Sequence, residues 1–222
     1  MERIIKVVLY VVLAASVLAG TAYFYAEAFY HKMVAEDSPF EYATAFVLLV
    51  ISVLFLVRII KIGKTQNRYW MVFNVLIVVG AFFGFGEELS WGQRIFSIDS
   101  GEFFLEQNRQ AETNLHNLEV NGVNINKLIF SQLMVIVFGF YFVFSQLLYK
   151  RLAFFKRLVD LFGVQIPRLK HSILMLACTG FILLVPDLRI WELWEAIFVT
   201  LLLLVFIDPI NTKEKLLAGA SA

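Results

Sequence analysis

The chain has 222 residues, of which 60 % are hydrophobic and 16 % aromatic, and its mean hydropathy is +0.76. Soluble domains are about 45–50 % apolar, and only 17 % of these residues are charged, so the composition excludes an ordinary soluble domain. The net charge of +1 comes with basic residues spread over several loops, which does not indicate a nucleic-acid partner.

Six apolar segments predict membrane spans, although the fifth is shorter than the roughly 20 residues that a helix needs to cross a bilayer. The segments are residues 4–26, 42–60, 69–85, 127–149, 171–185 and 190–207. We therefore expect an all-α fold, a polytopic transmembrane helical bundle that forms one integral membrane domain over residues 1–222.

A basic and apolar segment separates the fourth predicted span from the fifth. Lys150-Arg151 and Lys156-Arg157 recur among leucine, phenylalanine and valine residues at helical spacing. This pattern is typical of an amphipathic helix that lies on an anionic lipid leaflet.

The basic residues also predict an orientation. Most of the 19 lysines and arginines fall near the N-terminus, after the second span, after the fourth span and near the C-terminus, and six spans would place all four regions on one side. The positive-inside rule assigns that side to the cytoplasm. We expect both termini there, in a bacterial-type inner membrane, with residues 86–125 facing the periplasm or the exterior.

Two polar stretches follow the third span and are the candidate functional site. The first is Gly86-Glu87-Glu88-Leu89-Ser90-Trp91-Gly92-Gln93-Arg94, and the second covers residues 108–117. A charged side chain near the hydrocarbon costs about 2.5–3.5 kcal/mol on insertion scales, so adjacent carboxylates at the end of a span indicate a role beyond anchoring. We expect the two stretches to form halves of one site.

The first stretch predicts proton-transfer chemistry if the helix continues through Phe96. Helical spacing would place Glu87, Trp91 and Arg94 on one face, so that Arg94 holds Glu87 ionised and Glu88 is left for proton transfer. The predicted catalytic residues are Glu88, His116 and Glu87. The predicted substrate-binding residues are Arg94, Gln93, Trp91, Asn108 and Asn117.

The second stretch suggests a metal. Asn108, Glu112 and His116 recur every four residues, which would align them on one helical face. Glu88, Glu112 and His116 are the candidate ligands for one divalent ion, Zn, Mn or Fe. Two alternatives stay open: a metal-free Glu88–His116 pair that activates water or a hydroxyl, and a purely structural helix end with Trp91 in the aromatic belt.

Glu87-Glu88, followed by Arg94 and a later histidine, is similar to the paired-glutamate motif of the CAAX-processing and bacteriocin-immunity membrane proteases. That family uses Glu-Glu-x-x-x-Arg and separate histidine motifs to activate water. Here five residues separate Glu88 from Arg94, and the histidine motifs are missing. The likeness covers two or three residues and does not assign the family.

These patterns favour an integral membrane protein whose outward Glu/His/Arg pocket performs hydrolytic or transfer chemistry on a lipid or lipid-linked envelope component. The expected partners are membrane lipids and a lipid-linked or membrane-protein substrate, with no nucleic acid. The alternatives are a small transporter or proton-coupled channel, and a non-enzymatic scaffold or immunity-type protein.

Overall fold

The structure is a computed structural model that describes residues 2–35, 37–108, 111–115, 118–120, 123–124 and 134–211. Its longer helices are α1 (Glu2–Tyr25), α3 (Pro39–Ile62), α4 (Arg68–Glu88), α7 (Met134–Arg151), α8 (Ala153–Phe162), α9 (Leu169–Ile182) and α10 (Ile190–Ile207). The shorter elements are α2 (Glu27–Met33), η1 (Gly63–Thr65), η2 (Ser90–Gly92), α5 (Gln93–Phe96), α6 (Glu102–Gln107), β1 (Glu119–Val120) and β2 (Val123–Asn124).

The described residues contain four helices long and apolar enough to cross a membrane, namely α1, α3, α4 and α10. Helices α7 and α8 count as a fifth if the pair, bent by 114°, forms one span. Helix α9 is apolar but has only 14 residues, and residues 127–133 of the predicted fourth span lie outside the described part. The helical membrane architecture is confirmed at the level of four or five spans, and the sixth span stays a prediction.

The helical fold is confirmed, and the described residues also contain one very short pair of strands. Strands β1 and β2 pair antiparallel, with Glu119 opposite Asn124 and Val120 opposite Val123. An isolated two-stranded ribbon is only marginally stable. This short pair of strands therefore depends on the helical protein around it.

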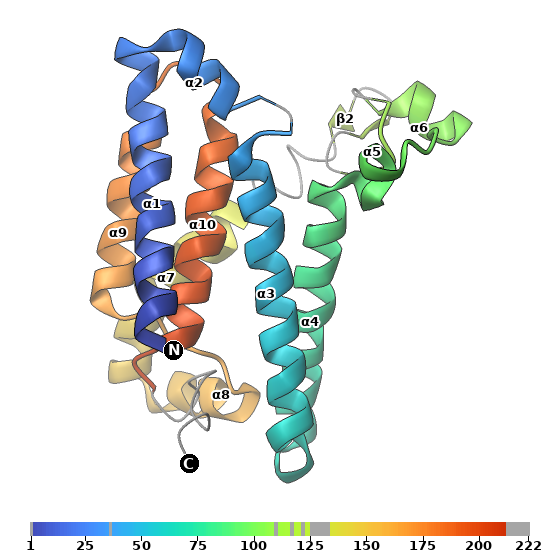
Figure 1. Ribbon diagram of the computed structural model, residues 1–222. Coiled ribbons are helices and arrows are strands. Elements are labelled where there is room, and N and C mark those ends of the chain that lie inside the picture. The colour runs from blue at the N-terminus through green and yellow to red at the C-terminus, as the bar shows by residue number, and fades with distance from the viewer. Residues whose placement is uncertain are drawn as a thin grey trace.

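Helix α10 is the centre of the bundle and packs against α1, α3 and α9 (Figure 1). Its side chains are buried almost without interruption from Leu193 to Ile207. The ring of Phe206 meets Phe55 of α3 edge-on at a centroid distance of 4.9 Å. Because lipid tails are as apolar as these side chains, van der Waals packing rather than the hydrophobic effect holds such helices together.

Helices α3 and α4 form an antiparallel hairpin whose ends are capped by the sequence. The Ser38 side chain accepts a hydrogen bond from Glu41 N before α3, and Asn67 accepts from Tyr69 N and Trp70 N before α4. Such caps satisfy backbone groups that have no partner inside the helix. The free face of α4 exposes Leu76 and Val79, as expected of a surface in contact with lipid.

The two ends of the bundle differ in composition. The N-terminal end of α1, the η1 turn and α8 lie at one end, and α2 and α5 lie at the other (Figure 1). At the first end, Asp208 accepts a hydrogen bond from Arg168 Nε at 3.0 Å and from Lys170 Nζ at 2.6 Å. This grouping agrees with the predicted charge asymmetry, and the cellular side of each end stays a prediction.

Candidate functional site

The α4 helix ends at Glu88, so the predicted continuation of the helix to Phe96 is wrong. Ser90, Trp91 and Gly92 follow in succession with φ values of 45°, 55° and 82°. Left-handed backbone costs roughly 1–2 kcal/mol for each residue that carries a Cβ. Two such residues in a row persist only where surrounding contacts determine the conformation.

Glu87 is the second-to-last residue of α4, and its carboxylate makes the first of these contacts. Glu87 Oε1 accepts a hydrogen bond from Trp91 Nε1 at 2.9 Å, and Oε2 accepts one from the backbone N of Leu115 at 2.5 Å. The side chain is only 6 % exposed. Glu87 therefore joins the end of α4 both to the strained turn and to the second polar stretch.

The second contact is centred on Ser90, which is fully buried. Its Oγ donates to Glu112 Oε2 at 2.5 Å, and Asn114 Nδ2 lies 2.9 Å from both Ser90 Oγ and Glu112 Oε2. Asn108 completes the group, because its Nδ2 donates to Asn114 Oδ1 and its Oδ1 accepts from Glu112 N. All four side chains are buried, so each polar group has its hydrogen bonds in a water-poor setting.

A third contact lies beside these two. Gln93 Oε1 accepts from the backbone N of Thr113 at 2.6 Å, and Gln93 Nε2 donates to Ser100 Oγ at 2.7 Å. Ser100 Oγ in turn donates to the carbonyl of Ala111. Gln93 thus connects α5 to the second stretch through its side-chain amide.

We call this hydrogen-bonded unit the clasp; it consists of Glu87, Ser90, Gln93, Ser100, Asn108, Glu112, Thr113 and Asn114. Its bonds join residues 87–93 to residues 108–115, so the prediction that the two stretches come together is confirmed. The predicted helical face of Asn108, Glu112 and His116 is wrong, because residues 111–115 are not helical. Asn108 and Glu112 still meet, through a turn rather than along a helix.

Trp91 is placed by contacts on both sides of its ring. The indole is 47 % exposed and lies edge-on to Phe83, with the ring centroids 5.7 Å apart. A Cβ on Gly86 would lie 2.7 Å from two carbons of the indole, so the close approach requires glycine at this position. The same indole donates to Glu87 through Nε1, which gives Trp91 a structural role in addition to its exposure at the end of the bundle.

The remaining predicted site residues are only partly placed. Glu88 is half-buried and directly follows Glu87 in α4. Arg94 has a described backbone in α5, but its side chain is outside the described part, as are His116 and Asn117 altogether. The predicted contacts of Arg94 with Glu87 and of Glu88 with His116 therefore stay predictions.

The metal prediction is likewise untested. Among the described residues, no group of three or more histidine, cysteine, aspartate or glutamate side chains is arranged to hold a metal ion. The set Glu88, Glu112 and His116 includes one residue outside that part. Glu112 Oε2 already accepts two hydrogen bonds within the clasp.

The predicted site residues did not include four members of the clasp, namely Ser90, Ser100, Thr113 and Asn114. Asn114 stood in the polar second stretch but had no assigned role, and Ser100 gave no signal, because an isolated serine in a loop is common. A stronger indication was the density of short polar side chains in residues 108–117, since asparagine and serine readily bond to nearby backbone groups.

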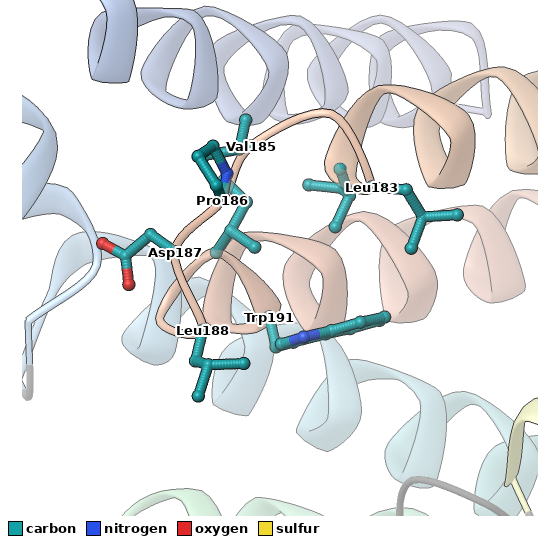
Figure 2. A pocket seen from close by; sticks show the side chains of 8 residues that line it. Leu183, Val185, Pro186, Asp187, Leu188 and Trp191 are labelled. Atoms are coloured by element: carbon teal, nitrogen blue, oxygen red, sulfur yellow. The ribbon is translucent and has the colours of Figure 1, made fainter.

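A surface pocket of about 320 Å³ lies elsewhere, at the loop between α9 and α10, and Figure 2 shows its lining. Leu183, Pro186, Leu188 and Trp191 make it largely apolar, and the Asp187 carboxylate points away from Leu183 and Trp191. Asp187 Oδ1 accepts from Arg189 N in the same turn. None of the predicted site residues lines this pocket.

Comparison of the chain with protein-family models, with curated proteins and with solved structures gives no match. The helices themselves define the class of protein, which is an integral membrane protein with four or five candidate spans. The clasp at the end of α4 is its most organised polar feature within the described residues.

Proposed function

We propose that the protein is an integral membrane hydrolase or transferase that acts on a lipid or a lipid-linked component. The observation that carries the proposal is the clasp, in which two buried carboxylates and a strained turn are held at the end of a membrane-spanning helix. Strained backbone clusters at active sites, and catalytic groups must be held by side chains whose own hydrogen bonds fix them. The clasp would therefore serve as a rigid frame for neighbouring reactive groups.

The reactive groups in this proposal are Glu88 and His116. Glu87 binds the backbone N of Leu115, the residue directly before the single histidine of residues 86–125. Glu88 accepts a proton from water or from an acceptor hydroxyl, and the oxygen attacks the ester carbon or the phosphorus of the substrate. Protonated His116 donates its proton to the leaving oxygen as the bond between that oxygen and the attacked atom breaks, and the proton on Glu88 then passes through solvent to His116. Glu112 orients the frame, and Arg94 binds the substrate.

A lipid-type substrate is supported by the surface next to the clasp. Ile95, Phe96 and Ile98 are between 59 % and 71 % exposed, and Phe103 and Leu105 of α6 are also exposed. An exposed apolar cluster of this kind marks an interaction surface. Helix α4 also exposes apolar side chains, so in this proposal a substrate within the bilayer reaches the clasp from the side.

A structural junction is the second candidate, and one observation favours it. Both oxygens of Glu87 accept hydrogen bonds from within the chain, which is what a junction between a helix and a loop requires. In that case the clasp would hold residues 108–115 on α4 and would have no substrate.

The deciding experiment is lipid turnover by the full-length protein. The purified protein would be placed in vesicles made from a total membrane lipid extract, and the lipids would be profiled by mass spectrometry over time. The variants are Glu88→Gln and His116→Ala, with Glu102→Gln as the control, because Glu102 is an exposed carboxylate of the same region. Metal content would be measured on the same samples.

General acid–base groups contribute about 10²–10⁴-fold to rate. We therefore expect a lipid product with the wild type and with Glu102→Gln, and a loss of at least about 100-fold with the two test variants. A stoichiometric metal lost from both variants would make the reaction metal-assisted. If Glu88→Gln and His116→Ala leave turnover unchanged, or if folded wild type gives no lipid product, the enzyme proposal is overturned. The clasp would then be a structural junction.

A further inference from the structure

Helix α8 lies across the bundle at the end opposite the clasp. The chain bends by 114° between α7 and α8, at Leu152, whose backbone is extended with φ −113° and ψ 110°. Figure 1 shows α8 near the lower end of α1, at the level of the lower parts of α3 and α4. A helix at this angle to a spanning helix is oriented to lie along the membrane surface.

The side of α8 that faces the bundle is firmly attached to α3 and α4. Asn67 Nδ2 donates to the carbonyl of Leu161 at 3.0 Å, and Arg58 Nη1 lies 3.5 Å from the carbonyl of Gly163. These donors meet the C-terminal carbonyls, where a helix has unpaired acceptors and the negative end of its dipole. Helix α8 is therefore held in one place and does not depend on lipid for its position.

Arg58 is itself fixed from three directions. It is 5 % exposed, its Nη1 donates to Asn74 Oδ1 at 2.9 Å, and its guanidinium lies 4.9 Å from the ring of Trp70. A buried guanidinium with these contacts holds its geometry closely. The attachment of α8 thus reaches into the packed interface between α3 and α4.

Positive charge and exposed apolar side chains occur together at the end of α7 and the start of α8. Lys150 and Arg151 at the end of α7, and Lys156 and Arg157 in α8, are all exposed. Phe154 beside them is 73 % exposed and Leu152 is 50 % exposed. We call these six residues the basic surface.

The same end of the bundle is basic beyond α8. Exposed Lys61, Lys64 and Arg68 lie in or beside the η1 turn. The acidic residue of α8 itself, Asp160, is half-buried and accepts from Tyr149 Oη at 3.3 Å. Within α8, Lys156 and Arg157 are therefore more exposed than Asp160, so the exposed charge of the helix is positive.

We propose that the basic surface binds the headgroups of anionic phospholipids, and that this binding stabilises the bundle. Ammonium and guanidinium groups pair with lipid phosphate, and Phe154 and Leu152 enter the acyl region as the apolar residues of interfacial helices do. Because α8 is bonded to α3 and α4, lipid bound on the basic surface adds to the stability of the whole bundle by mass action.

The test measures thermal unfolding of the detergent-purified, full-length protein during titration with phosphatidylglycerol, phosphatidylcholine or inorganic phosphate. The variant is Lys156→Gln/Arg157→Gln. The matched control is Lys32→Gln/Arg189→Gln, which removes two exposed positive charges at the opposite end. Native mass spectrometry counts bound lipid in the same samples.

We expect phosphatidylglycerol to raise the melting temperature of the wild type and of the control, while phosphatidylcholine and inorganic phosphate do not. Each basic side chain near an anionic surface contributes roughly fivefold, so the double variant should need roughly 30-fold more phosphatidylglycerol for the same shift. A response equal for both lipids, a double variant that behaves as the wild type, or an equal response to inorganic phosphate would overturn the proposal.

A second variant separates binding from stabilisation. Asn67→Ser keeps a side-chain oxygen that can cap α4 but is too short to donate to Leu161. We expect this variant to bind phosphatidylglycerol as the wild type does and to show a smaller rise in melting temperature. An unchanged rise would show that the attachment of α8 does not transmit the stabilisation.

Discussion

Ser90 Oγ donates a hydrogen bond of 2.5 Å to Glu112 Oε2, and 22 residues separate the two in the chain. Ser90 is fully buried and Glu112 is 8 % exposed. A bond between a hydroxyl and a buried carboxylate is charge-assisted and short. This one fastens the turn after α4 to residues 111–115, which belong to no helix or strand.

The Ser90→Ala variant should lose this bond without changing the shape of the turn. The Glu112 carboxylate would stay buried with one donor fewer, which costs about 1–3 kcal/mol of unfolding free energy. Denaturant titration in detergent measures the loss. Ser97→Ala is the control, because Ser97 also has a positive φ but is exposed; an equal loss in both variants would contradict the role of the bond.

Gly86→Ala should displace the Trp91 ring. The new Cβ would lie 2.7 Å from the indole, so the ring must move and its bond to Glu87 is weakened, at a cost of roughly 1–3 kcal/mol. Gly80→Ala in the same helix meets nothing within 4 Å, and it should be neutral or stabilising because alanine favours helix. Measured side by side, the melting temperature should therefore fall for Gly86→Ala and stay unchanged or rise for Gly80→Ala.

Gly92→Ala should strain the turn. Gly92 has φ +82° and a Cβ there would lie 3.0 Å from the Phe96 ring, so alanine should cost about 1–2 kcal/mol from the backbone alone. Gly101→Ala is the comparison, since Gly101 has φ −63° and open space around it. Equal unfolding free energies for the two variants would mean that the turn relaxes without cost.

The stability of the protein should fall in acid partly through Asp208. Burial raises the pKa of this carboxyl. The hydrogen bond from Lys170 and the charges of Lys170, Arg168 and Lys6 together lower the pKa by more than burial raises it, so the pKa of Asp208 lies below its usual range. A carboxyl whose folded pKa is depressed stabilises the folded state above its unfolded pKa, about 3.9, and loses that contribution as the pH falls through the folded pKa.

Asp208→Asn should therefore lower the melting temperature at pH 6 and flatten its dependence on pH below about 4. Melting curves between pH 2 and pH 6 provide the comparison. Asp99→Asn, at an exposed position, should retain the wild-type profile. Parallel profiles for Asp208→Asn and the wild type would show that the Asp208 ion pairs do not contribute.

The candidate site was only half predictable. Glu87, Glu88 and the polar residues of 108–117 were identifiable because polar groups at the end of an apolar span are costly. The pairing of particular atoms was not, because the bonds between the two stretches join residues 20 to 28 positions apart, a separation that the local pattern does not constrain. Gln93 was expected to bind substrate, yet its amide bonds to Thr113 and Ser100.

The sequence by itself determined the class of protein and its long helices. Apolar runs of spanning length must form helices in a bilayer, since their backbone groups find no partners in lipid. Local helical preference in residues 86–96 favoured a longer α4. Only the tertiary structure decided that α4 ends at Glu88. The left-handed turn after it is unfavourable alone and is offset by hydrogen bonds to residues 20 to 28 positions away in the chain.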